Sequence, residues 1–381
     1  MITKLYIKYS KFIRGRNGRE CIWLYKDEIQ KYIKILMYSP IRFRKAFNLI
    51  QIDEDRIFDI IRDRKPRSIA LNGPEPLLPK IQKVSEKIEN EFNIISYIIG
   101  DKSWGSCDLN THAAEMLGAD ILFNVGHTIT IENFGEKVFM INAFDTIRFD
   151  NVALKCATEL KGRFKTISLV TDSQHLHQID TVRKIFEDNG FVVVKGKGKG
   201  QLNDTQVFGC EFHPLHNIKS EIEAFIFLGQ SRFHSIGIAL STEKPTFMLD
   251  PYFEEFLQIN NEAEVVKKRA ILSVYKALDA RTLGIIIGLK EGQFANIKAL
   301  EFKKELSKLG INIQLIALTE ISNEKLENFR EIDAFIQVAC PRLGTDNYFS
   351  KPVLSVPQGL ALIKLLKKEP IEEFFKIQHW L

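Results

Sequence analysis

The sequence predicts an α/β fold of three similar domains, each with a four-stranded, mostly parallel sheet flanked by helices. Two observations predict this fold. Apolar segments of strand length alternate with segments of helical period from residue 53 to about residue 356, and their order repeats three times. Each repeat also carries one cysteine near the end of a predicted strand: Cys107, Cys210 and Cys340. Because these cysteines share one sheet edge, we expect a pseudo-threefold axis that brings the three thiols together.

The repeats set the predicted domain boundaries. The three α/β domains span residues 51–149, 150–255 and 256–381 and contain one of the three cysteines each. Residues 1–50 form a basic extension with 12 Lys and Arg against 3 Asp and Glu. This extension is predicted to be a tail, a small appended element or sequence upstream of the true start, since Met37 lies just before the first regular segment.

In the first domain, apolar residues recur on one helical face and alternate with short apolar runs. Helices are predicted over 53–63, from Leu77 through Ile81, Val84 and Ile88, and from Leu109 to Gly118, where glycine ends the segment. Strands are predicted over 68–72, 93–99, 120–125 and 137–142.

The second domain repeats this order. Helices are predicted over 151–160 and 176–189, the latter ended by Gly190, and the segment around Cys210 is predicted to be a loop. Strands are predicted over 165–171, 191–194, 224–228 and 246–249.

The third domain opens with a helix that carries Val266, Ala270, Val274 and Leu278 on one face, and a second helix ends at Gly310. Strands are predicted over 283–289, 311–318, 334–338 and 352–356. Pro341 cannot donate to a strand ladder, so Cys340 is placed at the C-terminal end of its strand. In open α/β sheets, that end is where ligands bind.

Composition excludes several classes of protein. No apolar run is long enough to span a bilayer and no signal peptide is visible, so we expect a cytoplasmic protein without membrane attachment. Five widely separated cysteines indicate a reducing compartment rather than a disulfide framework. Residues 1–50 carry a net charge of +9, so the other 331 residues carry −4 of the total +5, which argues against direct binding of nucleic acid.

Three cysteines from three domains suit an iron-sulfur cluster in which one iron has no protein ligand and stays open to substrate. Their spacing is not a motif in itself, and a buried free cysteine is often only an apolar core residue. A second interpretation uses Cys210, His213 and His216 as a local zinc site in a scaffold or non-catalytic partner protein. Pro214 argues against a continuous helical ligand face in that segment.

From about residue 53 to about residue 366 the chain resembles the archaeal 2-(3-amino-3-carboxypropyl)histidine synthase family, the enzymes of the first step of diphthamide synthesis. The resemblance includes the context of all three cysteines. Three departures are Ser106 for a usual Ala, Thr128 for a common Ser, and Asn347 for an acidic residue. The matching stretches are Gly105-Ser106-Cys107-Asp108, Gly126-His127-Thr128, Gln174-His175-Leu176-His177-Gln178, Gly209-Cys210, residues 229–239, Asp250-Pro251-Tyr252, residues 290–293 and Ala339-Cys340-Pro341-Arg342.

The resemblance implies a function. Cys107, Cys210 and Cys340 would hold a [4Fe-4S] cluster whose fourth iron faces S-adenosylmethionine, the cosubstrate. Reductive cleavage of the sulfonium would release methylthioadenosine and a 3-amino-3-carboxypropyl radical, which adds to imidazole C2 of a histidine on translation elongation factor 2. The implied partners are this protein substrate, a second copy in a homodimer and a small electron-donor protein.

The resemblance also implies the surroundings of the cluster. Asp108 and Arg342 would lie beside the ligating cysteines, and no residue is assigned as general acid or base. Loops 174–178, 231–237 and 290–293 would line the cosubstrate pocket, because they follow strands at the cysteine edge. The residues assigned to S-adenosylmethionine are Gln174, His175, Ser231, His234, Gly237 and Gln293.

Overall fold

Among the described residues, three large sheets match the three repeats of the sequence, and a two-stranded sheet accompanies them. The computed structural model describes residues 49–129, 135–200, 202–343 and 349–370. Asn347 and nearly all of the extension over 1–50 therefore lie outside the described residues. The α/β class and the mostly parallel sheets are confirmed, whereas the pseudo-threefold arrangement and the domain boundaries stay predictions.

The first sheet has the order β3-β2-β4-β5 and is parallel throughout. Its strands are β2 (Ser68–Asn72), β3 (Ile95–Ile98), β4 (Ile121–Val125) and β5 (Val138–Ile141). Its helices are α3 (Glu54–Arg64), α4 (Leu78–Phe92) and α5 (Thr111–Met116), with a 3-10 turn, η1 (Glu75–Leu77), before α4. α4 forms as predicted because Ile81, Val84 and Ile88 recur on its buried face.

A small antiparallel ribbon was not predicted. β1 (Ile50–Ile52) pairs with β6 (Ala143–Asp145), which places the start and the end of the first domain side by side. Strands of three residues are too short to show a period in the sequence.

The second sheet has five strands in the order β11-β10-β9-β7-β8 rather than the predicted four. The additional strand, β11, pairs antiparallel with β10 after a turn in which the Asp250 carboxylate accepts hydrogen bonds from the Tyr252 and Phe253 amides. β11 is mostly exposed, so it has no apolar pattern, and it begins at the predicted boundary at residue 255. The strands are β7 (Thr166–Thr171), β8 (Val192–Val193), β9 (Ala224–Leu228), β10 (Thr246–Asp250) and β11 (Glu255–Gln258).

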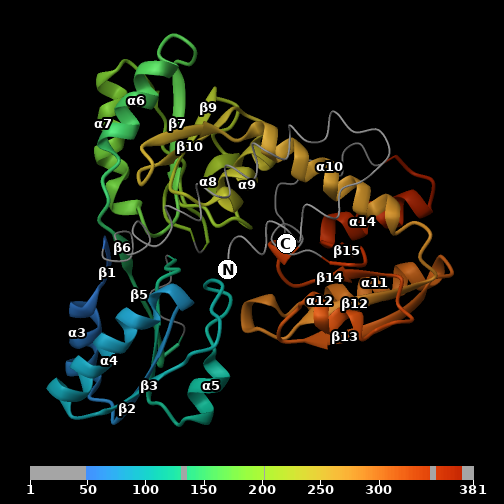
Figure 1. Ribbon diagram of the computed structural model, residues 1–381, viewed down its shortest axis with the longest axis horizontal. Helices are drawn as coiled ribbons and strands as arrows, with labels where there is room; N and C mark the ends of the chain where they lie inside the picture. The colour runs from blue at the N-terminus through green and yellow to red at the C-terminus, as the bar shows by residue number, and fades with distance from the viewer. Residues whose placement is uncertain (1–48, 130–134, 201, 344–348, 371–381) are drawn as a thin grey trace, which may run out of the picture. The chain divides into compact units, whose positions relative to one another are not determined.

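Helices cover this sheet, and two of them correct the prediction. α6 (Asp150–Leu160) and α7 (Ile179–Asp188), the latter preceded by the 3-10 turn η2 (Leu176–Gln178), lie side by side (Figure 1). The predicted loop over 231–237 is wrong, because α9 (Arg232–Thr242) begins there with Ser231 as its N-cap. The predicted loop around Cys210 also contains a short helix that was not predicted, α8 (His213–His216), which places Pro214 in its first turn, where no amide donor is needed.

The third sheet has the order β13-β12-β14-β15, again parallel. Its strands are β12 (Thr282–Gly288), β13 (Asn312–Leu318), β14 (Ala334–Gln337) and β15 (Val353–Leu354). Its helices are α10 (Asn260–Lys276), α11 (Asn296–Lys308), α12 (Asn323–Glu327) and α14 (Val356–Leu366), with the 3-10 turn η3 (Glu291–Gln293) after β12. α10 packs against both α9 and α14, so it links the second and third sheets.

Each sheet buries apolar side chains in two separate cores, as expected for a sheet covered on both sides. Polar and reactive residues are thereby left to the strand ends. The Cys107 loop follows β3, Cys340 follows β14, and the Cys210 segment is held at the end of β7 by a hydrogen bond from the Val207 amide to the Thr171 carbonyl, 2.8 Å. No helix in the described part of the chain is both long and apolar enough to cross a bilayer.

Candidate metal centre

The Cys107 loop is held by four consecutive residues, 290–293, of the loop that follows β12 in the third sheet. The Gly292 amide donates to the Cys107 carbonyl at 2.9 Å, and Gln293 Nε2 lies 3.5 Å from Cys107 Sγ. Lys290 forms an ion pair with Asp108, the residue after the cysteine. Glu291 Oε1 accepts hydrogen bonds from the Thr111 amide and hydroxyl, both at 2.8 Å. Residues 290–293 therefore fix the position of the Cys107 loop.

The ion pair of Asp108 with Lys290 is buried. The Asp108 side chain is 1% exposed and that of Lys290 is 12% exposed. Burial raises the pKa of the Asp108 carboxyl, and the hydrogen bond and charge of Lys290 act in the opposite direction. The same carboxylate accepts a hydrogen bond from the Trp104 amide at 3.2 Å, so it orders the turn that presents Cys107.

Arg342 brings all three cysteine segments into contact. Its guanidinium carbon lies 5.5 Å from the centroid of Trp104, which precedes Cys107, and 5.3 Å from that of Phe233. Phe233 packs on Gly209, beside Cys210, so closely that a Cβ added there would lie 1.9 Å from its ring. Arg342 itself follows Cys340 by two residues. Its cation–π contacts therefore connect the Cys340 segment with the Cys107 segment through Trp104, and with the Cys210 segment through Phe233.

The Cys210 thiol is within electrostatic reach of both other thiols. Burial raises the pKa of Cys210 well above its ordinary value, and the charges of Cys340 and Cys107 raise it further. Burial likewise raises the pKa of Cys107, against the hydrogen bond from Gln293. Three neighbouring thiolates repel one another unless a cationic group lies between them, and iron supplies such a charge. The residues therefore fit a shared metal group.

Cys156 provides the contrast. It lies fully buried on α6 in a core of the second sheet, and burial raises the pKa of its thiol to about 12. No other cysteine of the described residues affects this pKa, so Cys156 is an apolar core residue. No disulfide joins the cysteines of the described residues.

The structure does not show the ligand geometry that a zinc site at Cys210, His213 and His216 requires. Among the described residues, no three His, Cys, Asp or Glu side chains converge closely enough to hold a single metal ion. His213 Nδ1 faces Glu211 at 2.9 Å, and the rings of His213 and His216 are 6.3 Å apart. The same criterion does not exclude an iron-sulfur cluster, because each of its thiolates binds a different iron and the ligands stand farther apart.

The predicted cosubstrate residues fall into two groups. His175 is 4% exposed, packs edge-on against Phe149 at 5.0 Å, and its Nδ1 has no hydrogen-bond partner among the described residues. Ser231 Oγ lies 2.5 Å from Nδ1 of His234, whose ring stacks parallel to Phe227. These polar groups remain candidates for ligand contact.

The other three residues are engaged elsewhere. Gln174 Nε2 donates to the buried Asp145 carboxylate at 3.3 Å, and Gln293 contacts Cys107. Gly237 is buried inside α9, and a Cβ added there would lie 2.3 Å from the ring of Phe212. The prediction that Gly237 lines a pocket is corrected accordingly, since this glycine permits close packing of a helix on the core.

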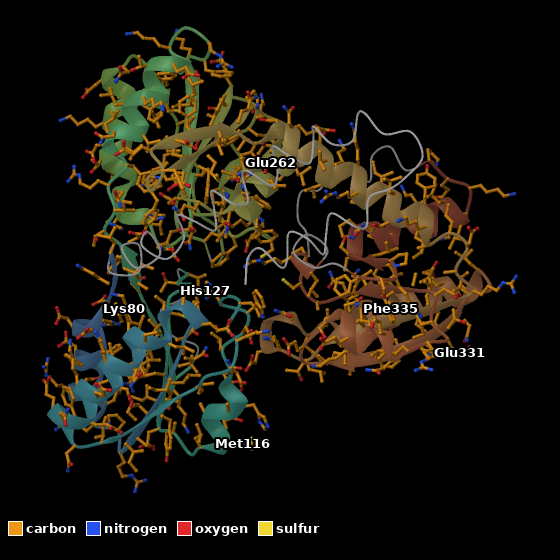
Figure 2. All side chains as sticks on the ribbon, viewed as in Figure 1. Lys80, Met116, His127, Glu262, Glu331 and Phe335 are labelled. Carbon is orange, nitrogen blue, oxygen red and sulfur yellow. The ribbon has the colours of Figure 1, made fainter. Side chains whose placement is uncertain are left out.

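His127 is a candidate site residue to which the sequence analysis gave no role. It follows β4 in the left-handed region at φ 51°, and its Nδ1 is buried with no hydrogen-bond partner in the described structure (labelled in Figure 2). Burial lowers the pKa of His127 from 6.5 to about 4, with His234 and Arg342 lowering it further and Asp172 opposing them. The signal in the sequence is a Gly-His pair directly after a buried strand, within a stretch that matches the family.

A pH dependence follows from this histidine. Its pKa is depressed in the folded state, so its contribution to stability is complete above pH 6.5 and is lost as the pH falls towards 4. Between pH 7.5 and pH 5 the free energy of unfolding should fall by about 2 kcal/mol more in the wild type than in His127→Asn. Asparagine tolerates the same backbone conformation. Urea unfolding at both pH values measures this difference, and equal losses in the two proteins would refute it.

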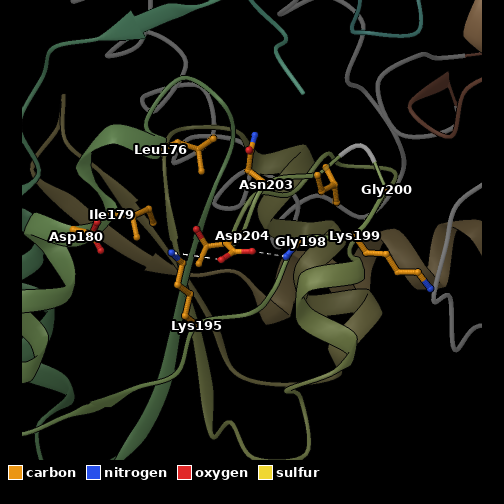
Figure 3. Close-up of a pocket in the computed structure, with 11 residues that line it drawn as sticks. Leu176, Ile179, Asp180, Lys195, Gly198, Lys199, Gly200, Asn203 and Asp204 are labelled. Atoms are coloured by element: carbon orange, nitrogen blue, oxygen red, sulfur yellow. Dashed lines mark hydrogen bonds and ion pairs between the residues drawn. The ribbon is translucent and has the colours of Figure 1, made fainter. Parts of the chain in front are cut away.

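A cavity of about 580 Å³ is lined by residues of the second repeat, and no cysteine is among them (Figure 3). Its walls include Leu176, Ile179, Lys195 and Asp204, and the Gly198 amide donates to the Asp204 carboxylate at 2.8 Å. Leu176 belongs to the predicted loop 174–178, but none of the six residues assigned to S-adenosylmethionine lines the cavity. The cavity therefore does not identify the cosubstrate site.

Comparison with known proteins gives a consistent result. A family model described as "Putative diphthamide synthesis protein" matches residues 73–372. The 2-(3-amino-3-carboxypropyl)histidine synthase of Pyrococcus horikoshii is 29% identical over 324 residues, which cover 84% of this chain and 92% of that protein. Subunit 1 of the same synthase from Caenorhabditis elegans is 28% identical, with 77% of this chain and 75% of the relative covered.

Two solved structures are similar to this chain over most of its length. The crystal structure of Dph2 from Pyrococcus horikoshii with a 4Fe-4S cluster superposes with a TM-score of 0.76 at 27% identity and covers 83% of this chain and 91% of that one. The crystal structure described without mention of the cluster gives the same values.

Proposed function

Because the chain belongs to the diphthamide synthesis protein family, we propose that it transfers the 3-amino-3-carboxypropyl group of S-adenosylmethionine to imidazole C2 of a histidine on translation elongation factor 2. The named relatives, archaeal and eukaryotic, are 2-(3-amino-3-carboxypropyl)histidine synthases or their subunits, so the enzyme class is that of a transferase. We place the reaction in the cytoplasm, with a homodimer as the working form and a small protein as electron donor.

One observation supports this proposal above the others: Arg342 joins the segments of Cys107, Cys210 and Cys340. We assign these three thiolates as the ligands of a [4Fe-4S] cluster. When bound, the cluster supplies the electron that cleaves the sulfonium bond of S-adenosylmethionine to the aminocarboxypropyl group.

The chain's own residues position the ligands. Arg342 holds the three cysteine segments together by its contacts with Trp104 and Phe233, and the Asp108 pair with Lys290 holds the turn around Cys107. A substrate group placed by such rigid loops loses less entropy when it reacts.

Two histidines are our candidates for binding the cosubstrate. Leaving a buried polar group such as His175 Nδ1 without a partner costs about 1–3 kcal/mol, and a ligand amine or hydroxyl would remove that cost. His234 presents a ring already held by Ser231 and Phe227. Neither is assigned a proton-transfer step.

The interpretation as a zinc-binding scaffold receives no support from the geometry, since Cys210, His213 and His216 do not converge. A non-catalytic partner would have no need for three thiols within electrostatic reach of one another.

The direct test is an anaerobic reaction of the reduced protein with S-adenosylmethionine and translation elongation factor 2. We expect one 3-amino-3-carboxypropyl group on the elongation factor, detected by mass spectrometry, for each methylthioadenosine released. An elongation factor whose target histidine is replaced serves as the control and should gain no mass. Methylthioadenosine release without modification of the intact elongation factor would contradict the transferase function.

A further inference from the structure

Residues 290–293 contact the Cys107 segment at every position, and only one of these contacts reaches the thiol. Lys290 pairs with Asp108, Glu291 binds Thr111, and the Gly292 amide donates to the Cys107 carbonyl. Gln293 Nε2, in contrast, points to Cys107 Sγ at 3.5 Å. The first three contacts hold the loop, whereas the fourth acts on the sulfur itself.

The loop that carries Gln293 packs closely against the Cys107 loop, which restricts the position of the Gln293 backbone. A Cβ on Gly292 would lie 2.5 Å from both Cα and Cβ of Cys107, so only glycine allows the two backbones to come this close. On its other side, Gln293 packs over Gly288, where an added Cβ would lie 3.3 Å from the Gln293 Cβ. Backbone contacts therefore fix the position of the Gln293 Cβ beside the Cys107 loop, and the side-chain amide reaches the sulfur from there.

We propose that Gln293 sets the reduction potential of the cluster by hydrogen bonding to the Cys107 sulfur, rather than by binding S-adenosylmethionine. This inference rests on the proposed role of Cys107 as a ligand. Hydrogen bonds to the sulfurs are among the factors that tune such potentials. An N–H dipole directed at the sulfur stabilises the reduced cluster, which carries one more negative charge, and so raises the potential.

The experiment is a redox titration of the anaerobic protein, followed by absorption and by electron paramagnetic resonance. Gln293→Met keeps the length of the side chain without a donor, and Gln293→Glu replaces the donor by a negative charge. We expect the reduced-to-oxidised ratio at a fixed potential to fall about tenfold in Gln293→Met, a shift of about 59 mV to lower potential for one electron. The shift should be larger in Gln293→Glu.

Glu291→Gln is the matched control, because its side chain contacts Thr111 and not the sulfur. Because this change also removes a negative charge, its midpoint should not fall below that of the wild type. An equal shift in Glu291→Gln would show that loosening of the loop causes the effect, and this would overturn the proposal. An unchanged midpoint in both Gln293 variants, or loss of their iron, would also overturn it.

Cys107→Ala separates this inference from the proposed function. If Cys107→Ala loses the cluster while Gln293→Met keeps the wild-type midpoint, the ligand assignment stands and the role of Gln293 fails. If Cys107→Ala keeps a complete cluster, the ligand assignment fails, and the role of Gln293 fails with it.

Discussion

Replacement of Cys107, Cys210 or Cys340 by alanine is expected to abolish most iron binding and to lower transferase activity by more than about 100-fold. Even residues that only support metal ligands contribute about 10–100-fold to affinity or activity, and each of these thiols is assigned as a direct ligand. Iron and sulfide analysis of anaerobically purified variants, together with the release of methylthioadenosine, measures both effects.

Cys156→Ala is the control for these variants. The Cys156 thiol lies in the core of the second sheet and contributes nothing to the metal centre. The iron content of the Cys156→Ala protein should therefore match that of the wild type. A variant of any of the three assigned cysteines that retains wild-type iron would contradict its assignment as a ligand.

Lys290→Met is expected to destabilise the protein by about 3–5 kcal/mol, the cost of removing one partner from a buried ion pair. The reason is that the Asp108 carboxylate, 1% exposed, would stay buried without its cation. Denaturant unfolding at pH 7 measures the loss. The double variant Lys290→Met with Asp108→Asn should recover part of it, because no charge is then left unpaired. Strictly additive losses in the double-mutant cycle would contradict this account.

The pH dependence of the same variant has a definite sign. Burial already raises the pKa of Asp108, and the loss of Lys290 raises it further. A carboxyl with a raised pKa in the folded state adds stability below its unfolded pKa and loses it as the pH rises through the folded value. The deficit of Lys290→Met should therefore shrink as the pH is lowered from 7 towards 4.

The regular elements could be predicted because their patterns are local. α4 shows its buried face at helical spacing in Ile81, Val84 and Ile88, and β12 is a continuous apolar run. α9 was missed because its C-terminal half is buried all round, from Gly237 to Thr242, so no single apolar stripe marks it. α8 was missed because a proline in a first turn resembles a proline that breaks a helix.

The site could be predicted only in part. The position of Cys340 follows from a strand that ends before a proline, and this argument needs only neighbouring residues. The contact of Lys290 with Asp108 joins residues 182 positions apart, and the Arg342 contacts with Trp104 and Phe233 join three sheets. Such contacts depend on how the sheets pack, which no period or motif in the sequence encodes.

The measurement that tests the shared centre most directly is metal and sulfide analysis of the anaerobically purified protein, with its visible spectrum before and after reduction. We predict about four irons and four sulfides per chain, as a cysteine-held [4Fe-4S] cluster requires, and a visible band that bleaches on reduction. About one zinc per chain, no visible band, and loss of that zinc in His213→Ala would contradict the account.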